Sequence, residues 1–441
     1  MAGKGRDQLP RLVFADCNAK VHDHPYLGMA GRSGHTFVLP EEAELVPLPE
    51  GSQLFTMPGR FPVGWDEGEG DFVVLDEAEI DKKETPYLAV AAFLPPGYTR
   101  TLLPATKLQG QWPILPLWAY CSIGWRDGKF WITGVQVDPN PHWDPVFFQN
   151  DKDLALRVNR FLKTYEGNRL VKQLSRCALE YHCFAAKNVF YRRWECPLPT
   201  SPICNAECIG CLSSQPPESC TASHERIDFV PTVGEVTQVA LPHLQEAEDA
   251  IISFGQGCEG EPLLQVELLE KSISTLRHKS DRGTININTN ASIPRSVDRL
   301  CRAGLDSIRI TINSPDPQLY DSYFKPKGYG ISHVMESIHR AKECGIFTAI
   351  NLLIFPGVND REEEVERLIS FIGETNIDMI QMRNLNIDPD LYLQAIDLRG
   401  GEAIGISKMI DMIRKEFPHL ILGYFNQTKE TFSHNPLEDA T

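Results

Sequence analysis

Three cysteines stand close together in the stretch CNAECIGC, at positions 204, 208 and 211. Their spacing, C-x-x-x-C-x-x-C, brings three thiols to one loop. A structural zinc site takes four ligands, usually from two C-x-x-C knuckles, whereas these cysteines all lie in one loop. A [4Fe-4S] cluster commonly takes four thiolates, so three would leave one iron with an open position. The spacing therefore favours an iron–sulfur cluster whose open iron binds a small molecule.

Polar or glycine-rich sequence follows each of six expected strands. The six segments are CNAECIGC (204–211), GQGCEGEP (255–262), TNAS (289–292), INSPD (312–316), FPGVND (355–360) and RNLN (383–386). In a β/α barrel, chemistry lies at the carboxyl ends of the strands. Packing alone does not account for six such segments, so we expect them to lie together at one end of the barrel.

The elements that would position these segments alternate regularly from about residue 187. We expect strands at VFYRRWECPL, AIISFG, TININTN, SIRITINS, IFTAINLLIF and IDMIQMRNL, each followed by a helix with apolar residues at three- and four-residue spacing. Regular alternation implies a parallel sheet. The predicted fold class is α/β, a partial or full (β/α) barrel of about six units over residues 187–425, of TIM-barrel type.

The rest of the chain has a different character. Residues 1–150 hold short apolar runs with Pro and Gly, and Asp127-Gly128 between two aromatic runs predicts a hairpin. We expect a smaller β-rich N-terminal domain there, of unassigned role. Residues 151–186 predict a helical connector, and residues 426–441 a loose tail.

The cysteine triplet in this position resembles the radical SAM superfamily, over roughly residues 190–425. The resemblance implies that Cys204, Cys208 and Cys211 ligate a [4Fe-4S] cluster and that S-adenosylmethionine chelates the fourth iron. One electron would then cleave a carbon–sulfur bond of the sulfonium, giving methionine and a 5′-deoxyadenosyl radical. That radical would abstract hydrogen from a substrate that the sequence does not identify.

The same resemblance assigns further contacts to S-adenosylmethionine. The segment Gly260-Glu261-Pro262 resembles the family's G-G-E-P motif, whose backbone meets the methionine amino group. The other implied cofactor-binding residues are Thr289, Asn290, Thr311, Asn313, Asn351, Gln381 and Arg383.

Two positions depart from the family pattern. Glu259 stands where glycine is common, and Gly210 stands where an aromatic residue often packs near the adenine. The packing of the adenine must therefore differ from that pattern, or Ile209 must supply it.

The other cysteines leave two interpretations open: a second, auxiliary iron–sulfur cluster, or small buried apolar residues. The catalytic residues are left open: Cys258 and Cys220 are candidates for donating a hydrogen atom to a product radical, and Tyr320 is a candidate for covering the substrate, with helix packing as its alternative. His22 and His24 form an H-x-H beside Cys17, for which a metal site and a surface loop both remain open.

Composition limits the partners. The chain has 441 residues, a net charge of −16 and 12 cysteines, and no apolar run long enough to span a bilayer. Such acidity counts against nucleic acid. We expect a cytoplasmic enzyme with a small-molecule or peptide substrate and an electron donor such as flavodoxin or ferredoxin. Two alternatives remain: a non-catalytic iron–sulfur or zinc protein acting as scaffold or electron carrier, and an RNA-modifying radical SAM enzyme.

Overall fold

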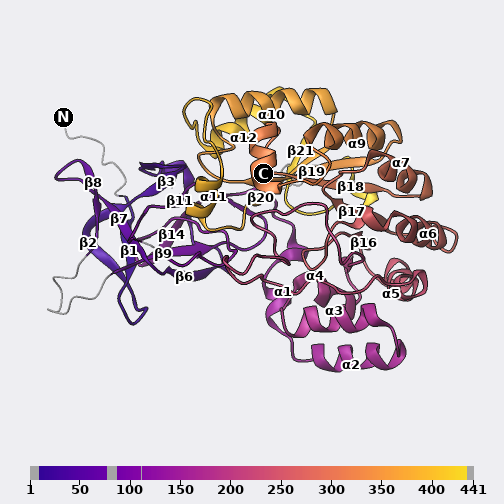
Figure 1. Cartoon of the computed structure of the whole chain (residues 1–441). Helices are drawn as coiled ribbons and strands as arrows, with labels where there is room; N and C mark the ends of the chain where they lie inside the picture. The colour runs from indigo at the N-terminus through magenta and orange to yellow at the C-terminus, as the bar shows by residue number, and fades with distance from the viewer. Residues whose placement is uncertain (1–8, 77–86, 111, 435–441) are drawn as a thin grey trace.

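A computed structural model describes residues 9–76, 87–110 and 112–434. The N-terminal part is an antiparallel β structure that lies beside a larger α/β unit (Figure 1). Its strands are β1 Arg11–Ala15, β2 Val21–Met29, β3 Gly31–Ser33, β4 Thr36–Val38, β5 Leu45–Pro47, β6 Gln53–Met57, β7 Arg60–Asp66, β8 Asp71–Val74, β9 Leu88–Phe93, β10 Tyr98–Arg100, β11 Leu103–Pro104, β12 Thr106–Leu108, β13 Ile123–Arg126 and β14 Lys129–Gln136. The predicted β-rich character of this part is confirmed.

The predicted hairpin is present between β13 and β14. Arg126 pairs with Lys129, and the two turn residues, Asp127 and Gly128, both have positive φ (52° and 75°). Two consecutive residues of positive φ define the type I′ turn, whose twist matches that of antiparallel strands.

Helices follow from residue 146, but one of them replaces a predicted strand. The helices are α1 Val146–Gln149, α2 Leu154–Thr164, α3 Arg169–Leu179 and α4 Phe184–Tyr191. The strand expected over VFYRRWECPL was wrong in its first half, since α4 runs to Tyr191 and strand β15 covers only Glu195–Leu198. The buried face of α4 packs on its neighbours, and this tertiary packing overrides the β propensity of Val, Phe and Tyr. Arg192 and Trp194, both of positive φ, then turn the chain into β15.

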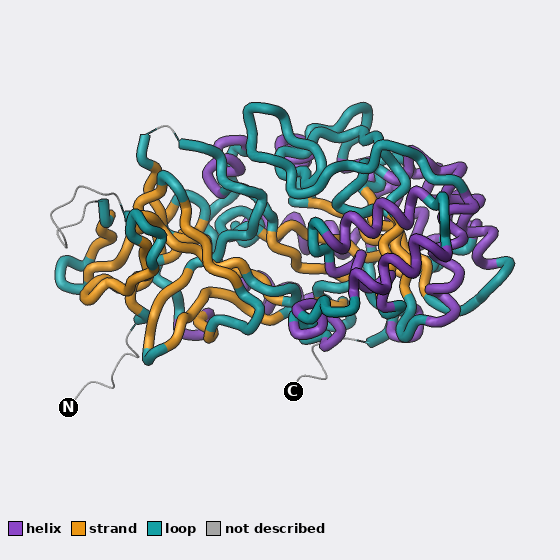
Figure 2. The backbone as a smooth tube through the Cα atoms, turned by 90° about the horizontal axis from the view of Figure 1, so that it is seen from below, coloured by secondary structure: helices purple, strands orange, loops and turns teal. Residues whose placement is uncertain are grey.

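The larger unit is a seven-stranded parallel sheet in the order β15-β16-β17-β18-β19-β20-β21. Its later strands are β16 Ile251–Phe254, β17 Thr284–Thr289, β18 Ser307–Ile312, β19 Phe347–Ile354, β20 Met379–Asn384 and β21 Ile421–Gly423. Its helices are α5 Val233–Glu246, α6 Val266–Arg277, α7 Pro294–Ala303, α8 Pro317–Phe324, α9 Ile331–Glu343, α10 Glu362–Thr375, α11 Pro389–Ala395 and α12 Ile406–Glu416. Figure 2 shows helices gathered outside these strands. Among the described residues β21 does not pair with β15, so the barrel is partial.

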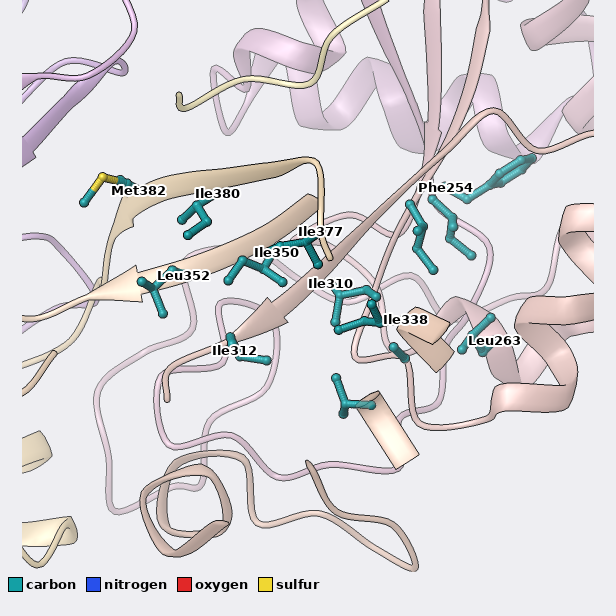
Figure 3. Packing of buried hydrophobic residues seen from close by; sticks show 14 of the residues in the cluster. Phe254, Leu263, Ile310, Ile312, Ile338, Ile350, Leu352, Ile377, Ile380 and Met382 are labelled. Atoms are coloured by element: carbon teal, nitrogen blue, oxygen red, sulfur yellow. The ribbon is translucent and has the colours of Figure 1, made fainter. Parts of the chain in front are cut away.

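Alternate residues of the barrel strands face the helices and form the core. Ile310 and Ile312 of β18 lie near Ile350 and Leu352 of β19, and Ile338 of α9 packs in the same cluster (Figure 3). The residues between them, such as Arg309 and Thr311, therefore point into the barrel. None of the helices in the described ranges is long and apolar enough to span a bilayer.

The C-terminal segment up to residue 434 is not the loose tail that the sequence predicted. The Lys429 N–H donates to Thr284 Oγ1 at 2.8 Å, and the Phe432 ring stacks on Phe347 at 4.2 Å. Both partners begin barrel strands, so this segment covers the end of the barrel opposite the cysteine loop. Residues 435–441 of the predicted tail lie outside the described residues.

The N-terminal part contacts the carboxyl end of β20 and the loop that follows. Thr99 Oγ1 donates to the Met382 carbonyl at 2.6 Å, and the Arg100 N–H donates to Asn384 Oδ1 at 2.9 Å. Arg60 pairs with Asp388 at 2.6 Å, and each side chain is only 2% exposed. The β structure is thereby fixed at the edge of the barrel mouth.

We expect Arg60→Ala to lower the free energy of unfolding by about 3 kcal/mol, because it leaves a buried carboxylate at Asp388 without its cation. Urea unfolding followed by tryptophan fluorescence measures the loss. Arg302→Ala removes an exposed i,i+4 pair with Asp298 and should cost less than about 1 kcal/mol. Equal shifts of the two unfolding midpoints would contradict a structural role for the Arg60 pair.

Candidate metal and cofactor site

The cysteine loop follows β15 and is held by backbone hydrogen bonds to the end of α8. The Glu207 N–H donates to Phe324 O, and the Ile209 N–H donates to Tyr323 O, both at 3.0 Å. The Asn205 amide adds a side-chain link to the strand β17 end, since Asn205 Nδ2 donates to Ser292 Oγ at 2.9 Å. The loop that carries the three cysteines is therefore fixed on two sides.

The three predicted ligands, Cys204, Cys208 and Cys211, are all partly exposed. Burial raises the pKa of the Cys208 thiol well above its usual value, and the charges of Cys211 and Cys204 raise it further. Burial also raises the pKa of Cys204. The charge of Arg226 lowers the pKa of both Cys208 and Cys204, and its Nη2 lies 3.4 Å from Cys211 Sγ. The three thiols are expected to lose their protons when they bind a cationic metal centre.

The donor types suit an iron–sulfur cluster. Three thiols come from one loop, and a structural zinc site would need a fourth protein ligand. A [4Fe-4S] cluster held by three thiolates keeps one iron open for a small molecule. The Arg226 guanidinium lies beside the thiols as a positive charge and not as a ligand. Among the residues that the structure describes, no group of three His, Cys, Asp or Glu side chains is placed to hold a metal ion.

The segment after β16 approaches the cysteine loop very closely at Gly260. The Gly260 N–H donates to Ser201 O at 2.7 Å, and the Glu261 N–H donates to Ile203 O at 2.9 Å. A Cβ at Gly260 would lie 2.0 Å from the Ile203 carbonyl oxygen, so only glycine fits. The predicted motif Gly260-Glu261-Pro262 is thus placed directly beside the residues that lead into Cys204.

Glu261 joins this segment to the end of β17. Its carboxylate accepts hydrogen bonds from Thr289 Oγ1 at 2.5 Å, the Asn290 N–H at 2.9 Å and the Leu263 N–H at 2.9 Å. Asn290 Nδ2 in turn donates to Asn205 Oδ1 at 2.9 Å. Thr289 and Asn290 therefore hold the site together, and their predicted contact with S-adenosylmethionine remains a prediction.

Glu259, a departure from the family pattern, has a structural role that the sequence did not reveal. Its buried carboxylate accepts from the N–H groups of Thr200, Ser201 and Gln256 at 2.6 to 2.8 Å. It therefore ties the ends of β15 and β16 together. Burial raises the pKa of Glu259 and of Glu261 to about 7, although the N–H donors lower both.

We expect Glu261→Gln to lower the free energy of unfolding by about 1–3 kcal/mol, because a glutamine NH2 group cannot accept the bonds that one carboxylate oxygen now accepts. Thermal unfolding measures the change. Glu267→Gln, at an exposed position of α6, is the matched control and should leave the melting temperature nearly unchanged. A loss no larger than that of Glu267→Gln would contradict the role assigned to Glu261.

Gly210, the second departure, lies against an aromatic residue from another element. A Cβ at Gly210 would stand 2.8 Å from the Tyr323 hydroxyl. Tyr323 belongs to α8 and is buried. The Tyr323 ring therefore lies beside the residue that precedes the last cysteine. The sequence did not reveal this contact, because Tyr323 lies more than a hundred positions away from the loop.

The remaining predicted cofactor residues point into the barrel from β18, β19 and β20 or lie just beyond. Asn351 Nδ2 donates to Thr311 Oγ1 at 3.2 Å, and Asn313 Nδ2 donates to the Leu319 carbonyl at 2.9 Å. The buried Oδ1 atoms of Asn351 and Asn313 have no hydrogen-bond partner in the described structure. Asn313 is fully buried, whereas Asn351 keeps some exposed surface inside the barrel, so a ligand there would meet Asn351.

Polar side chains also form a ring deeper in the barrel. Asn426 Nδ2 donates to Glu195 Oε1 at 2.7 Å, and Gln381 Nε2 donates to Asn426 Oδ1 at 2.9 Å. The ring continues from Glu195 to Ser253 at 2.6 Å and from Gln381 to Arg309 at 3.3 Å. Asn426 therefore bridges the open side of the partial barrel. Barrel interiors of this type are usually filled by branched apolar side chains, so the polar lining indicates a place for a polar ligand.

The three catalytic candidates lie in different surroundings. Cys258 is buried, and its hydrogen bond to Cys177 raises the pKa of Cys258 and lowers that of Cys177. Cys220 is partly exposed, and burial raises its pKa. Tyr320 is fully buried and stacks on Phe324 at 4.5 Å, which is typical of packing. A catalytic role for any of them remains a prediction.

The auxiliary cluster and the H-x-H site both remain predictions. Cys183 lies near the Cys177–Cys258 pair, which brings three of the other cysteines together. His22 Nε2 is paired with Asp16 at 3.0 Å, and His24 Nδ1 accepts from the Leu27 N–H at 2.9 Å. Both histidines lie on strand β2 and are half-buried, so the surface-loop interpretation was wrong, and a metal site there remains a prediction.

In a comparison with known protein families, residues 198–372 match the family model of the radical SAM superfamily. "Molybdenum cofactor biosynthesis protein 1" of Bos taurus is 26% identical over 219 residues, which are 49% of this chain and 31% of that protein. "GTP 3′,8-cyclase" of Petrotoga mobilis is 25% identical over 236 residues, which are 53% of this chain and 64% of that enzyme. The chain thus spans about a third of the length of the first of these relatives. The solved structure of methylornithine synthase aligns over 60% of this chain and 78% of its own, at 14% identity and a TM-score of 0.38.

Proposed function

We propose that this chain, whose residues 198–372 belong to the radical SAM superfamily, is an enzyme that cleaves S-adenosylmethionine reductively and abstracts hydrogen from a substrate. The family implies a [4Fe-4S] cluster and S-adenosylmethionine as cofactors. When bound, the cluster would supply one electron for reductive cleavage of the sulfonium to methionine and a 5′-deoxyadenosyl radical. Hydrogen abstraction from the substrate would convert that radical to 5′-deoxyadenosine.

The proposal rests on one observation. The loop with the three thiols is joined by backbone hydrogen bonds to the segment that would contact the methionine amino group. Cys204, Cys208 and Cys211 would hold the cluster, and the loop contains no fourth cysteine. Gly260 and Glu261 are joined by backbone hydrogen bonds to residues 201–203. Cluster and cosubstrate would therefore be held by one rigid piece of structure, as chemistry between them requires.

The proposed partners follow from charge and access. An electron donor of the flavodoxin or ferredoxin class would deliver the electron. The acidity of the chain favours a small-molecule or peptide substrate over nucleic acid. All twelve cysteines are free, which suits the reducing cytoplasm as the proposed compartment.

The experiment that tests this site is anaerobic reconstitution with iron and sulfide, followed by electron paramagnetic resonance of the dithionite-reduced protein. We expect about four irons per chain and a spectrum that changes when S-adenosylmethionine is added. Cys17→Ala, at an exposed position outside the barrel, is the control and should behave like the natural protein. A reduced cluster whose spectrum S-adenosylmethionine does not change would favour the electron-carrier or scaffold alternative.

A further inference from the structure

Two arginines inside the barrel have charges that nothing described in the chain neutralises by an ion pair. Arg309 lies on β18 and Arg383 on β20, and both are partly exposed. Arg309 Nη1 donates to Gln381 Oε1 at 3.3 Å, and Arg383 Nε donates to the Tyr424 carbonyl at 3.0 Å. Neither of these acceptors is charged. Within the described ranges, no carboxylate forms an ion pair with either guanidinium.

The two guanidiniums occupy an unfavourable environment as they stand. Arg309 Nε is buried and has no hydrogen-bond partner in the part of the chain described. Burial lowers the pKa of Arg309 to about 9 and the charge of Arg383 adds to this effect, whereas the charges of Glu195 and Tyr424 oppose it. Arg383 also stacks over the Tyr424 ring, with 4.8 Å to its centroid. Two like charges near each other in a partly buried space are costly unless an anion lies between them.

The rest of the chain points away from a structural explanation. Two other buried arginines are paired with carboxylates, Arg60 with Asp388 and Arg32 with Asp390 at 2.8 Å. The fully buried Arg100 has no carboxylate partner, but its Nη1 and Nη2 both donate to backbone carbonyls, of Tyr120 and Leu385. The net charge of −16 means that the outer surface repels anions. A cationic pair kept inside such a chain is suited to select an anion that enters the barrel.

We propose that Arg309 and Arg383 bind the anionic group of the substrate, a phosphate or a carboxylate, inside the barrel. This rests on the proposed function, since it names the substrate class of the same enzyme. Guanidinium groups bind both anions through paired N–H donors. The free Oδ1 of Asn351, one strand away from each arginine, offers an acceptor for a hydroxyl or amino group of the same molecule. The substrate is thus an anion that also carries a hydrogen-bond donor.

A neighbouring cavity does not fit this ligand. A cavity of about 480 Å³ lies near the amino ends of β15 and β16, and its lining includes Asp138, Glu195 and Asp249. These three carboxylates would repel an anion. Binding is therefore expected on the arginine side of the polar ring.

The test is equilibrium dialysis of the reconstituted protein against radiolabelled inorganic phosphate and, separately, radiolabelled acetate, without S-adenosylmethionine or reductant. We expect one site for at least one probe. Arg309→Gln and Arg383→Gln should weaken it about tenfold or more, the loss typical of a hydrogen bond to a charged group. Arg309→Lys and Arg383→Lys should retain part of the affinity, because the charge remains. Arg295→Gln, the same change at an exposed site, should retain all of it.

The probes separate the two sources of the anion: phosphate binding indicates a phosphate ester, and acetate binding alone indicates a carboxylate. If Arg309→Gln fails to fold, Arg383→Gln and the two lysine variants still test the proposal. Equal affinity in all variants, or no binding of either probe to the natural chain, would overturn the proposal. Because the assay contains no S-adenosylmethionine, its result is independent of whether the chain cleaves that cosubstrate.

Discussion

Replacing Cys208 by alanine is expected to reduce the iron content after reconstitution from about four per chain to near zero. Cys208 lies between the other two ligands in the loop, and their charges all act on one another. With two thiolates left, two irons of the cluster would lack a protein ligand. Colorimetric iron analysis of the purified protein measures the loss. Cleavage of S-adenosylmethionine should fall with it, below detection.

The control for this variant is Cys344→Ala, which removes an exposed cysteine at the end of α9. It should keep the full iron content. Circular dichroism of both variants establishes that the barrel is still folded. Full iron in Cys208→Ala would contradict the assignment of the ligands, and would move attention to the cysteines around Cys258.

The second large effect is expected for Gly260→Ala. The added methyl group would lie 2.0 Å from the Ile203 oxygen and 3.1 Å from the Cys204 nitrogen, so the two backbone segments must separate. The hydrogen bonds from the Gly260 and Glu261 N–H groups would then break. We expect S-adenosylmethionine to bind at least tenfold more weakly, since a loss of about 1.4 kcal/mol suffices for that. Isothermal titration of the reconstituted protein measures the dissociation constant.

Gly330→Ala provides the matched comparison. Nothing lies within 4 Å of the place that an added methyl group would take at Gly330, and its φ of −158° is extended backbone that any residue adopts. This variant should bind S-adenosylmethionine as the natural chain does. If Gly260→Ala bound equally well, the close approach at Gly260 would have no bearing on the cosubstrate.

The sequence predicted the barrel and its mouth because both depend on local patterns. Alternating strands and helices imply a parallel sheet, and the carboxyl ends of parallel strands meet at one edge. The cysteine loop and the Gly260 segment therefore could be expected to meet. The seventh strand, β21, was missed because three residues carry no readable periodicity. The short helices α8 and α11 were missed for a similar reason.

The contacts that the sequence did not predict join residues far apart in the chain. Asn426 and Glu195 are separated by 231 positions, and Arg60 and Asp388 by 328. No spacing rule connects such pairs. Glu259 illustrates another limit of the sequence. It looked like a departure from the family motif, whereas its carboxylate connects the ends of two strands through hydrogen bonds. Arg383 was expected near S-adenosylmethionine, and that contact remains untested; we propose instead that it binds the substrate together with Arg309, whose pKa its charge lowers.

The central claim is reductive cleavage of S-adenosylmethionine, and product analysis tests it most directly. The reconstituted protein is mixed anaerobically with dithionite and S-adenosylmethionine, and 5′-deoxyadenosine and methionine are quantified by liquid chromatography and mass spectrometry. The account predicts equal amounts of both products, formed by the natural chain and not by Cys208→Ala. An intact cluster in the natural chain with no 5′-deoxyadenosine formed would contradict it.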